Sequence, residues 1–175
     1  PTVRQRLESL ACAFGVNPSF NDIWGHRHDV SDAGLRALLG ELGACAGTEA
    51  DIERTLGQAH VHYWRRLAEP VLALTLPFAM IEMPVRIPRP DGGSARLCWR
   101  LVPESGEALH GEPDLDTLSL QAAVDVEGVR HESRLLLIEV ALAPGYHRLE
   151  IQAGGVRAQV LVIAAPSRCF QSPLL

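Results

Sequence analysis

The sequence contains no lysine, and all 16 of its basic residues are arginine. The 21 acidic residues outnumber them, which gives a formal net charge of −5 at pH 7. A protein that binds nucleic acid generally needs a basic face to contact the phosphates. The charge balance therefore argues against a nucleic acid as a partner.

Long hydrophobic runs are also absent. No apolar run approaches the roughly 20 residues that a membrane-spanning helix needs. The first ten residues, PTVRQRLESL, lack the apolar core of a secretion signal. We therefore expect a cytoplasmic location and no membrane partner.

Cysteine is scarce and scattered. The four cysteines are Cys12, Cys45, Cys98 and Cys169, and no two of them form a C-x-x-C pair. This spacing supports neither a zinc site nor a disulfide framework. Reduced thiols, most of them buried, are the preferred interpretation.

Aromatic residues make up only 5% of the chain, so an aromatic sugar-binding platform has few candidates. Trp99 alternates with apolar neighbours and is expected in a sheet core. Trp64 lies beside an apolar helical stripe and is expected to pack helix against sheet. Trp24 lies in a loop, where core packing is the preferred interpretation and contact with a glucan is the alternative.

No nucleophile elbow, phosphate-binding loop or dinucleotide fingerprint is present. Paired carboxylates are the remaining hydrolytic candidate, and the sequence offers Asp114, Asp116, Glu127 and Glu132. Nothing in their spacing indicates burial or mutual proximity. We interpret all four as solvated charges and predict no catalytic residue in this chain.

The histidines give no metal site either. His60 and His62 are two apart on a predicted helix, so their rings point in different directions. His26 and His28 lie in a loop and could share a metal, but no cysteine or carboxylate completes a recognisable ligand set. We predict neither a metal nor a cofactor.

Residues 1–69 carry helical patterns, with apolar residues three and four positions apart. Ser31, and Thr48 with Asp51, are suited to cap the second and third helices. We expect three short helices that pack together. Their apolar positions are Val3, Leu7, Leu10, Ala11 and Phe14 in the first, Leu35, Leu38, Leu39 and Leu42 in the second, and Ile52, Leu56, Ala59, Tyr63 and Leu67 in the third.

From Pro70 onward the pattern changes to short strands with no helix between them. About seven strands in roughly 100 residues is the density of an immunoglobulin-like sandwich. The predicted fold class is thus α+β, a three-helix segment followed by an all-β, immunoglobulin-like antiparallel sandwich. The strand candidates are residues 71–74, 80–87, 95–102 and 120–126, and three more within 135–169.

The most specific local prediction is a hairpin formed by residues 147–152 and 156–162. Apolar and polar residues alternate along both strands, and Gly154-Gly155 permits a two-residue loop. This loop places Ile151 opposite Ala158. A slip by one residue would instead place Ile151 opposite Arg157, so the alternation selects the register.

The segment before this hairpin, Ala143-Pro144-Gly145-Tyr146, suits a type II turn, because proline presets φ at the second position and glycine tolerates positive φ at the third. His147 lies on the inward face of its strand and is expected to be a core histidine. Gly92-Gly93 is expected to form another hairpin turn.

The last strands are apolar on both faces. Leu161 and Ile163 alternate with Val160 and Val162, which indicates cover on both sides. We expect the helices to cover part of the outer face and self-association to cover the rest. The other residues assigned to this face are Leu136, Ile138 and Leu142.

Two motifs resemble bacterial 4-α-glucanotransferases of the amylomaltase type. The first is Trp24-Gly25 followed by Val30-Ser31, with Leu38-Leu39 and Leu42-Gly43 in the helix. The second is Leu142-x-Pro144-Gly145-Tyr146-His147-x-Leu149 followed by Ala165-Pro166-x-Arg168-Cys169-Phe170. Where the family usually has tyrosine after the cysteine, this chain has phenylalanine.

The resemblance implies a non-catalytic extension that precedes a (β/α)8 barrel of about 250 residues. The family's barrel carries an Asp nucleophile, a Glu acid/base and a third Asp, and none of them maps onto this chain. The implied domains are a helical part at 1–69, the sandwich at 70–168 and the start of a linker at 169–175. The implied partners are the catalytic barrel and an α-1,4-glucan.

The whole enzyme would transfer α-1,4-glucan segments between maltodextrins by a retaining double displacement, without a metal or organic cofactor. A free-standing immunoglobulin-like interaction module is the alternative, and a small independent enzyme is the third candidate.

Overall fold

The structure, a computed structural model, describes residues 1–78, 80–89 and 96–169. It divides into two units, residues 1–63 and 64–175. Several sequence predictions lie outside the described residues. They are the Gly92-Gly93 turn, the start of a strand at Ala95, and the linker from Phe170 onward.

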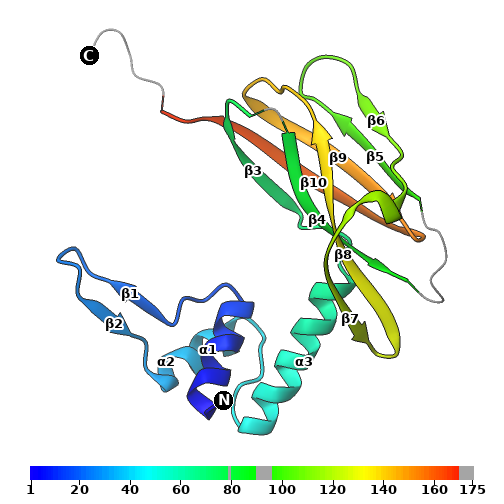
Figure 1. Ribbon diagram of the computed structural model, residues 1–175. Helices are drawn as coiled ribbons and strands as arrows, with labels where there is room; N and C mark the ends of the chain where they lie inside the picture. Colours follow the sequence, from blue (N-terminus) through cyan, green and yellow to red (C-terminus); the bar gives the residue numbers. More distant parts are fainter. Residues whose placement is uncertain (79, 90–95, 170–175) are drawn as a thin grey trace, which may run out of the picture. The chain divides into compact units, whose positions relative to one another are not determined.

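Three helices make up most of the first unit (Figure 1): α1 (Val3–Ala13), α2 (Asp32–Glu41) and α3 (Glu49–Arg65), whose last residues belong to the second unit. A small core forms between them, as the apolar spacing predicts. Its buried members are Leu7, Leu10, Ala11, Leu35, Leu39, Ala44, Ala46 and Ile52.

Not all of the residues predicted on the apolar faces of these helices are buried. Leu38 and Leu42 are exposed, because successive helical residues lie about 100° apart and only the Leu35–Leu39 row of α2 faces inward. Tyr63 is also exposed. Leu67 lies beyond the end of α3 and is buried in the core of the second unit.

Each helix begins at the kind of capping residue that satisfies its free backbone N–H groups. Ser31 Oγ accepts a hydrogen bond from Gly34 N at 3.1 Å. Thr48 and Asp51 form a reciprocal pair, in which Thr48 Oγ1 accepts from Asp51 N at 3.1 Å and Asp51 Oδ2 accepts from Thr48 N at 3.0 Å. The predicted caps of α2 and α3 are confirmed.

The segment between α1 and α2 is a β-hairpin and not a plain loop. Its strands are β1 (Ser19–Asn21) and β2 (Arg27–Asp29), paired antiparallel with Phe20 opposite His28 (Figure 1). Strands of three residues are too short to show a period-two pattern, which is why the sequence did not predict them.

Two sheets form the second unit and pack as a sandwich (Figure 1). One has the order β3-β10-β9-β5-β6 and the other β4-β8-β7. The strands are β3 (Val71–Leu76), β4 (Met80–Pro88), β5 (Leu97–Val102), β6 (Leu109–Gly111), β7 (Ser119–Val126), β8 (Val129–Glu139), β9 (Gly145–Ala153) and β10 (Val156–Pro166), with a 3-10 turn, η2 (Leu115–Thr117). The three-residue β6 was not predicted.

The register of the predicted hairpin is confirmed. Ile151 lies opposite Ala158, and the pairing continues along β9 and β10 as the alternation requires. Both loop residues have positive φ, 55° at Gly154 and 79° at Gly155. Two successive positive φ values define the tight hairpin turn that suits the right-handed twist of the strands.

The sandwich is not wholly antiparallel. β3 pairs in parallel with β10, with Val71 opposite Leu161. The two strands lie at opposite ends of the unit's sequence, so no short turn forces them to run in opposite directions. The hydrophobic alternation of β3 is the same in either direction, and so the sequence did not reveal its orientation.

The core lies between the two sheets. Leu136 and Ile138 are buried there, so the prediction that they belong to the outer face is wrong. Leu137, which lies between them on β8, is exposed. All residues of this run are apolar, so their alternation cannot indicate which set faces inward. Leu161 is exposed as expected.

Two of the three tryptophans are shielded from solvent, and one of them packs against this core. Trp64 is buried, and Trp99 is half-buried and packs against the core cluster. The cysteines are free, but none is buried: Cys98 is half-exposed and the others are exposed. The expectation of mostly buried thiols is therefore wrong: Cys45 and Cys169 lie outside the helices and strands, and Cys12 and Cys98 lie on the outer sides of α1 and β5. No helix in the described ranges has both the length and the apolar character needed to cross a membrane.

Candidate functional site

The tip of the β1–β2 hairpin is organised by the carboxylate of Asp22. Asp22 Oδ1 accepts hydrogen bonds from the backbone N–H groups of Trp24 at 2.9 Å and His26 at 2.8 Å. The backbone closes the same turn, where Gly25 N donates to Asp22 O at 3.0 Å. One side chain therefore fixes the path of residues 22–26.

The other oxygen of Asp22 faces two imidazoles. Asp22 Oδ2 lies 3.0 Å from His28 Nε2 and 3.4 Å from His26 Nδ1. The ring of Phe20 stacks on that of His28, with centroids 5.3 Å apart and planes at 21°. The two strands of the hairpin are thus tied together by a ring pair and by the hydrogen bond between Asp22 and His28.

These contacts lower the pKa of Asp22 below its usual value. The hydrogen bond from His28 is the main cause. Burial opposes it, and the backbone N–H groups of His26 and Trp24 lower the pKa further. A carboxylate that accepts several hydrogen bonds is stabilised in its charged form. Asp22 is therefore an ionised structural anchor and not an acid.

A fixed turn presents apolar side chains to solvent. Trp24 is 76% exposed and Ile23 is 89% exposed, and Phe20 next to them is also mostly exposed. The preferred interpretation of Trp24 as a core residue is therefore wrong. The alternation that marks a core position does not exist in a five-residue turn, so the sequence had no signal that could separate a core tryptophan from an exposed one.

The two histidine pairs, His26 with His28 and His60 with His62, do not form a metal site. Asp22 joins His26 and His28, which no motif indicated, but the residues that the structure describes contain no group of three or more His, Cys, Asp or Glu side chains placed to hold a metal. His60 and His62 lie two apart on α3, as expected.

His147 connects two parts of the sandwich. It is 4% exposed, and its Nδ1 accepts a hydrogen bond from the backbone N–H of Glu104 at 3.1 Å. Because Nδ1 is the acceptor, the proton lies on Nε2, which donates to Ala143 O at 3.1 Å. His147 is a core histidine that fastens the loop after β5 to the segment before β9.

Gly145 is enclosed by the same loop. Glu104 Oε2 accepts a hydrogen bond from Tyr146 N at 3.0 Å, and a Cβ added at Gly145 would lie 2.3 Å from that oxygen. The residue begins β9 with a φ of 156°, far from the value near +80° of a type II turn. The predicted turn type at Pro144-Gly145 is therefore wrong, and the glycine is needed for close packing against Glu104.

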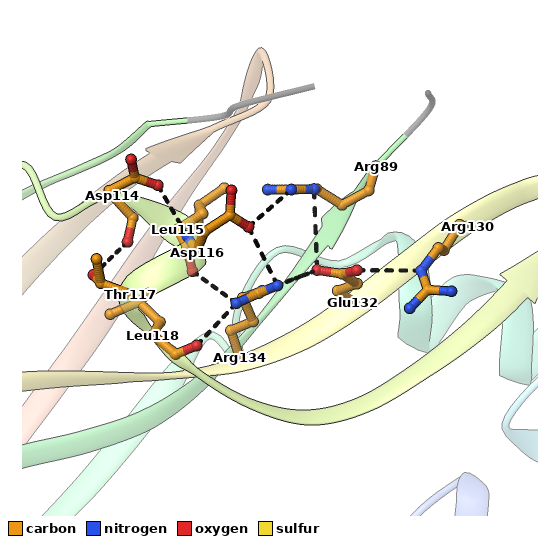
Figure 2. Close-up of polar contacts among 9 residues, drawn as sticks. All are labelled: Arg89, Asp114, Leu115, Asp116, Thr117, Leu118, Arg130, Glu132 and Arg134. Carbon is orange, nitrogen blue, oxygen red and sulfur yellow. Dashed lines mark hydrogen bonds and ion pairs between the residues drawn. The ribbon is translucent and has the colours of Figure 1, made fainter. Parts of the chain in front are cut away.

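Three of the four candidate carboxylates, Asp114, Asp116 and Glu132, lie in one cluster of polar contacts centred on Glu132 (Figure 2). Glu132 Oε2 lies 2.8 Å from Arg134 Nη2, and Oε1 lies 3.2 Å from Arg130 Nε. Arg89 completes the set, with its Nε 4.0 Å from Glu132 Oε2 and its Nη2 2.9 Å from Asp116 Oδ1.

Arg134 also organises the short turn that carries Asp116. Its Nη1 donates to the carbonyl oxygens of Leu115 at 3.0 Å and Leu118 at 2.9 Å (Figure 2). Asp114 caps this 3-10 turn by accepting from Asp116 N at 3.0 Å. The cluster therefore joins η2 to β8 and to the end of β4.

Burial acts to raise the pKa of Glu132, but the hydrogen bonds from Arg134 and Arg130 and the charges of Arg134 and Arg89 outweigh it and hold the pKa below its usual range. A general acid at neutral pH needs the opposite shift. The arrangement is that of a structural ion cluster.

The interpretation of all four carboxylates as solvated is wrong for Glu132, which is only 7% exposed. The sequence did contain an indication of this cluster. Arg130, Glu132 and Arg134 are two residues apart on one strand and so share a face, where an acidic residue between two basic ones is favoured. Glu127 is solvated as expected and forms an ion pair with Arg65.

Comparisons with known proteins agree on one family. Over 160 residues, or 91% of this chain, the sequence is 28% identical to the 4-alpha-glucanotransferases of Mycobacterium bovis and of Mycobacterium tuberculosis strain H37Rv. The chain spans 21% of the length of these relatives.

Among solved structures, the amylomaltase from Corynebacterium glutamicum has a similar fold, with a TM-score of 0.69 and 24% identity over 94% of this chain and 23% of that one. The sequence also matches a known domain family. Residues 69–166, more than half of the chain, match the family described as MalQ N-terminal beta sandwich domain. The chain belongs to the MalQ N-terminal beta sandwich domain family.

Proposed function

We propose that this chain is the N-terminal accessory region of a 4-α-glucanotransferase, an enzyme that transfers α-1,4-glucan segments between maltodextrins. The observation that carries the proposal is the family match over residues 69–166, together with relatives that have this activity and of whose length the matched 160 residues are only 21%. Its principal partner would be the catalytic barrel of the same polypeptide.

We propose further that the chain contributes no catalytic group. Glu132, the most deeply buried of the candidate carboxylates, is held ionised by arginines, and Asp116 is bound to Arg89. A retaining glycosidase-type mechanism needs one carboxylic acid that keeps its proton and one free carboxylate close to it. Neither condition fits this cluster.

Three finer assignments belong to the same proposal. The sandwich is of the immunoglobulin-like type, which is supported by a three-stranded sheet of β4, β8 and β7 facing a sheet with β10, β9 and β5 at its centre. The domain limits are 1–69, 70–168 and 169–175, supported by the family match that begins at residue 69. The location is cytoplasmic, as for the expected metabolism of maltodextrins.

Trp24 is proposed to contact the glucan. An exposed indole can stack on the apolar face of a sugar ring, and the Asp22 contacts hold the turn before any ligand arrives. Replacing Trp24 with alanine should weaken binding of maltoheptaose, whereas Ile23→Ala, a change at a more exposed neighbour, should leave it nearly unchanged.

Self-association is a second proposed property, and it is also the behaviour expected of an interaction module. The exposed apolar residues Val71, Tyr146 and Leu161 lie on or beside the paired strands β3, β9 and β10. Light scattering between about 10 and 100 μM, the range of modest interfaces, would detect a dimer.

The test of the main proposal is an assay of the purified chain with maltotriose, with the Mycobacterium tuberculosis enzyme as a positive control. The chain should release no glucose above the buffer control. Glucose release that follows the chain through purification would contradict the assignment as an accessory region.

A further inference from the structure

β3 (Val71–Leu76) is an open edge of the five-stranded sheet (Figure 1). It is the first strand in the order β3-β10-β9-β5-β6, and among the described residues no strand pairs with its other side. An open edge presents backbone N–H and C=O groups that can pair with another strand. β3 is therefore a candidate interaction surface.

The other edge strands of the sandwich carry features that discourage pairing, such as proline, a bulge or short length. β4 contains Pro84 and Pro88, β7 has an irregular register between Leu120 and Ala122, and β6 is three residues long. All six residues of β3 are described, and they include no charged residue, no proline and no register shift against β10. The edge of β3 is thus unprotected.

The backbone of β3 shows which residues face this edge. Leu161 N of β10 donates a hydrogen bond to Pro70 O at 2.8 Å. Alternate residues of a strand direct their N–H and C=O groups to opposite sides, so every second residue from Pro70 faces β10 and the others face the open edge. The residues that face the open edge are Val71, Ala73 and Thr75.

The sequence of this edge is nearly symmetric about Ala73, because residues 71–75 read VLALT. In an antiparallel pair with Ala73 opposite Ala73 of a second copy, Leu72 lies opposite Leu74, and Val71 lies opposite Thr75, which has the same branched shape. The three outward-facing residues of each copy are then opposite one another, which allows about six hydrogen bonds. A slip by one residue would oppose them to residues whose backbone groups face β10.

The side chains fit the same register. Leu72 and Leu74 are half-buried and pack against the sandwich core, so their meeting across the pair would extend that core. On the outer face, Ala73 lies opposite Ile163, which lies opposite the exposed Tyr146. Pairing would therefore place two apolar rows end to end across the contact.

We propose that two copies of this chain associate by antiparallel pairing of β3 with β3, with Ala73 on the two-fold axis. The proposal gives the contact for the self-association in the proposed function, and it rests on that property. A second copy is the occupant that meets each residue of 71–75 with one of matching shape and polarity. β3 has no charged residue that would select a charged partner instead.

The experiment is amide hydrogen exchange, followed by NMR on the isotopically labelled 175-residue chain at about 50 μM and about 1 mM. For a dissociation constant of about 100 μM, the amides of Val71, Ala73 and Thr75 should exchange about threefold more slowly at the higher concentration, because fewer copies are monomeric. The amides of Leu72 and Leu74 face β10 in each copy and should exchange equally at both concentrations. They serve as the internal control.

The matched variants are Ala73→Lys and Ala165→Lys. Ala73→Lys places two positive charges opposite each other on the axis and should raise the dissociation constant, measured by light scattering, about fivefold or more. Ala165 is an exposed alanine of β10, one strand away from the open edge, and its variant should dimerise normally. Retained protection of the Leu72 and Leu74 amides would show that Ala73→Lys is folded.

A strictly monomeric chain at 1 mM would overturn both the pairing and the self-association, while the accessory role, which the maltotriose assay tests, would stand. A dimer in which the amides of Val71, Ala73 and Thr75 exchange equally at both concentrations would overturn the pairing alone. Equal weakening by Ala73→Lys and Ala165→Lys would likewise contradict it, because the contact would then lie on the outer face of the sheet.

Discussion

Asp22 Oδ2 and His28 Nε2 lie 3.0 Å apart across the β1–β2 hairpin, and the other oxygen of the same carboxylate holds two backbone N–H groups of the turn. A single side chain thus connects the strands and shapes the tip. The exposed Trp24 depends on this connection for its fixed position.

Asp22→Ala should release the tip, because the N–H groups of Trp24 and His26 lose their acceptor. We expect faster hydrogen exchange at both amides with little change in the global unfolding temperature, since few buried contacts are lost. Asp29→Ala is the control, because it removes only an exposed pair with Arg27. Unchanged exchange in Asp22→Ala would refute the anchoring role.

The same hairpin should respond to acid. The pKa of Asp22 is lowered in the folded state, mainly by His28, from a usual value of 3.8. Its stabilising contribution is therefore present above that value and is lost as the pH falls through the lower folded pKa. The protection of the Trp24 and His26 amides should persist down to about pH 4 and decline below it, and the decline should be absent in Asp22→Asn.

Gly145→Ala should destabilise the sandwich by about 1 kcal/mol, the usual net contribution of one hydrogen bond. The new Cβ would displace the Glu104 carboxylate and so break its bond to Tyr146 N. Gly40→Ala is the matched control: it adds a methyl group to open space on α2 and should stabilise the chain slightly. Chemical denaturation of both variants measures the difference, and equal stability would contradict this role of Glu104.

Glu132→Gln should cost about 3 kcal/mol, because it removes the buried counter-charge of Arg89 and Arg134 and leaves them only the exposed Asp116. Arg130→Ala removes only the exposed partner of Glu132 and should cost less than about 1 kcal/mol. A small effect of Glu132→Gln on the free energy of unfolding would show that the cluster is solvated after all.

The parts of the fold that depend on local pattern could be predicted from the sequence. The pairing of Ile151 with Ala158 follows from alternation and a two-glycine loop, and the cap at Ser31 follows from its place before an apolar stripe. Both depend on residues that are close in sequence, where spacing and chemistry are informative.

Features that depend on distant residues could not be predicted. The parallel pairing of β3 with β10 joins the two ends of the sandwich, and the packing of Gly145 against Glu104 joins two separate loops. The candidate site shows the same limit. Trp24 could be singled out by its position in a loop, but its exposure depends on how Asp22 folds the turn.

The central claim is that this chain is the accessory region of a longer glucan-transferring enzyme. The most direct measurement is the sequence of the natural gene downstream of the codon for Leu175. We predict several hundred further codons in the same frame, with the strand–helix alternation of a (β/α)8 barrel and its catalytic carboxylates. A stop codon immediately after this chain would contradict the claim.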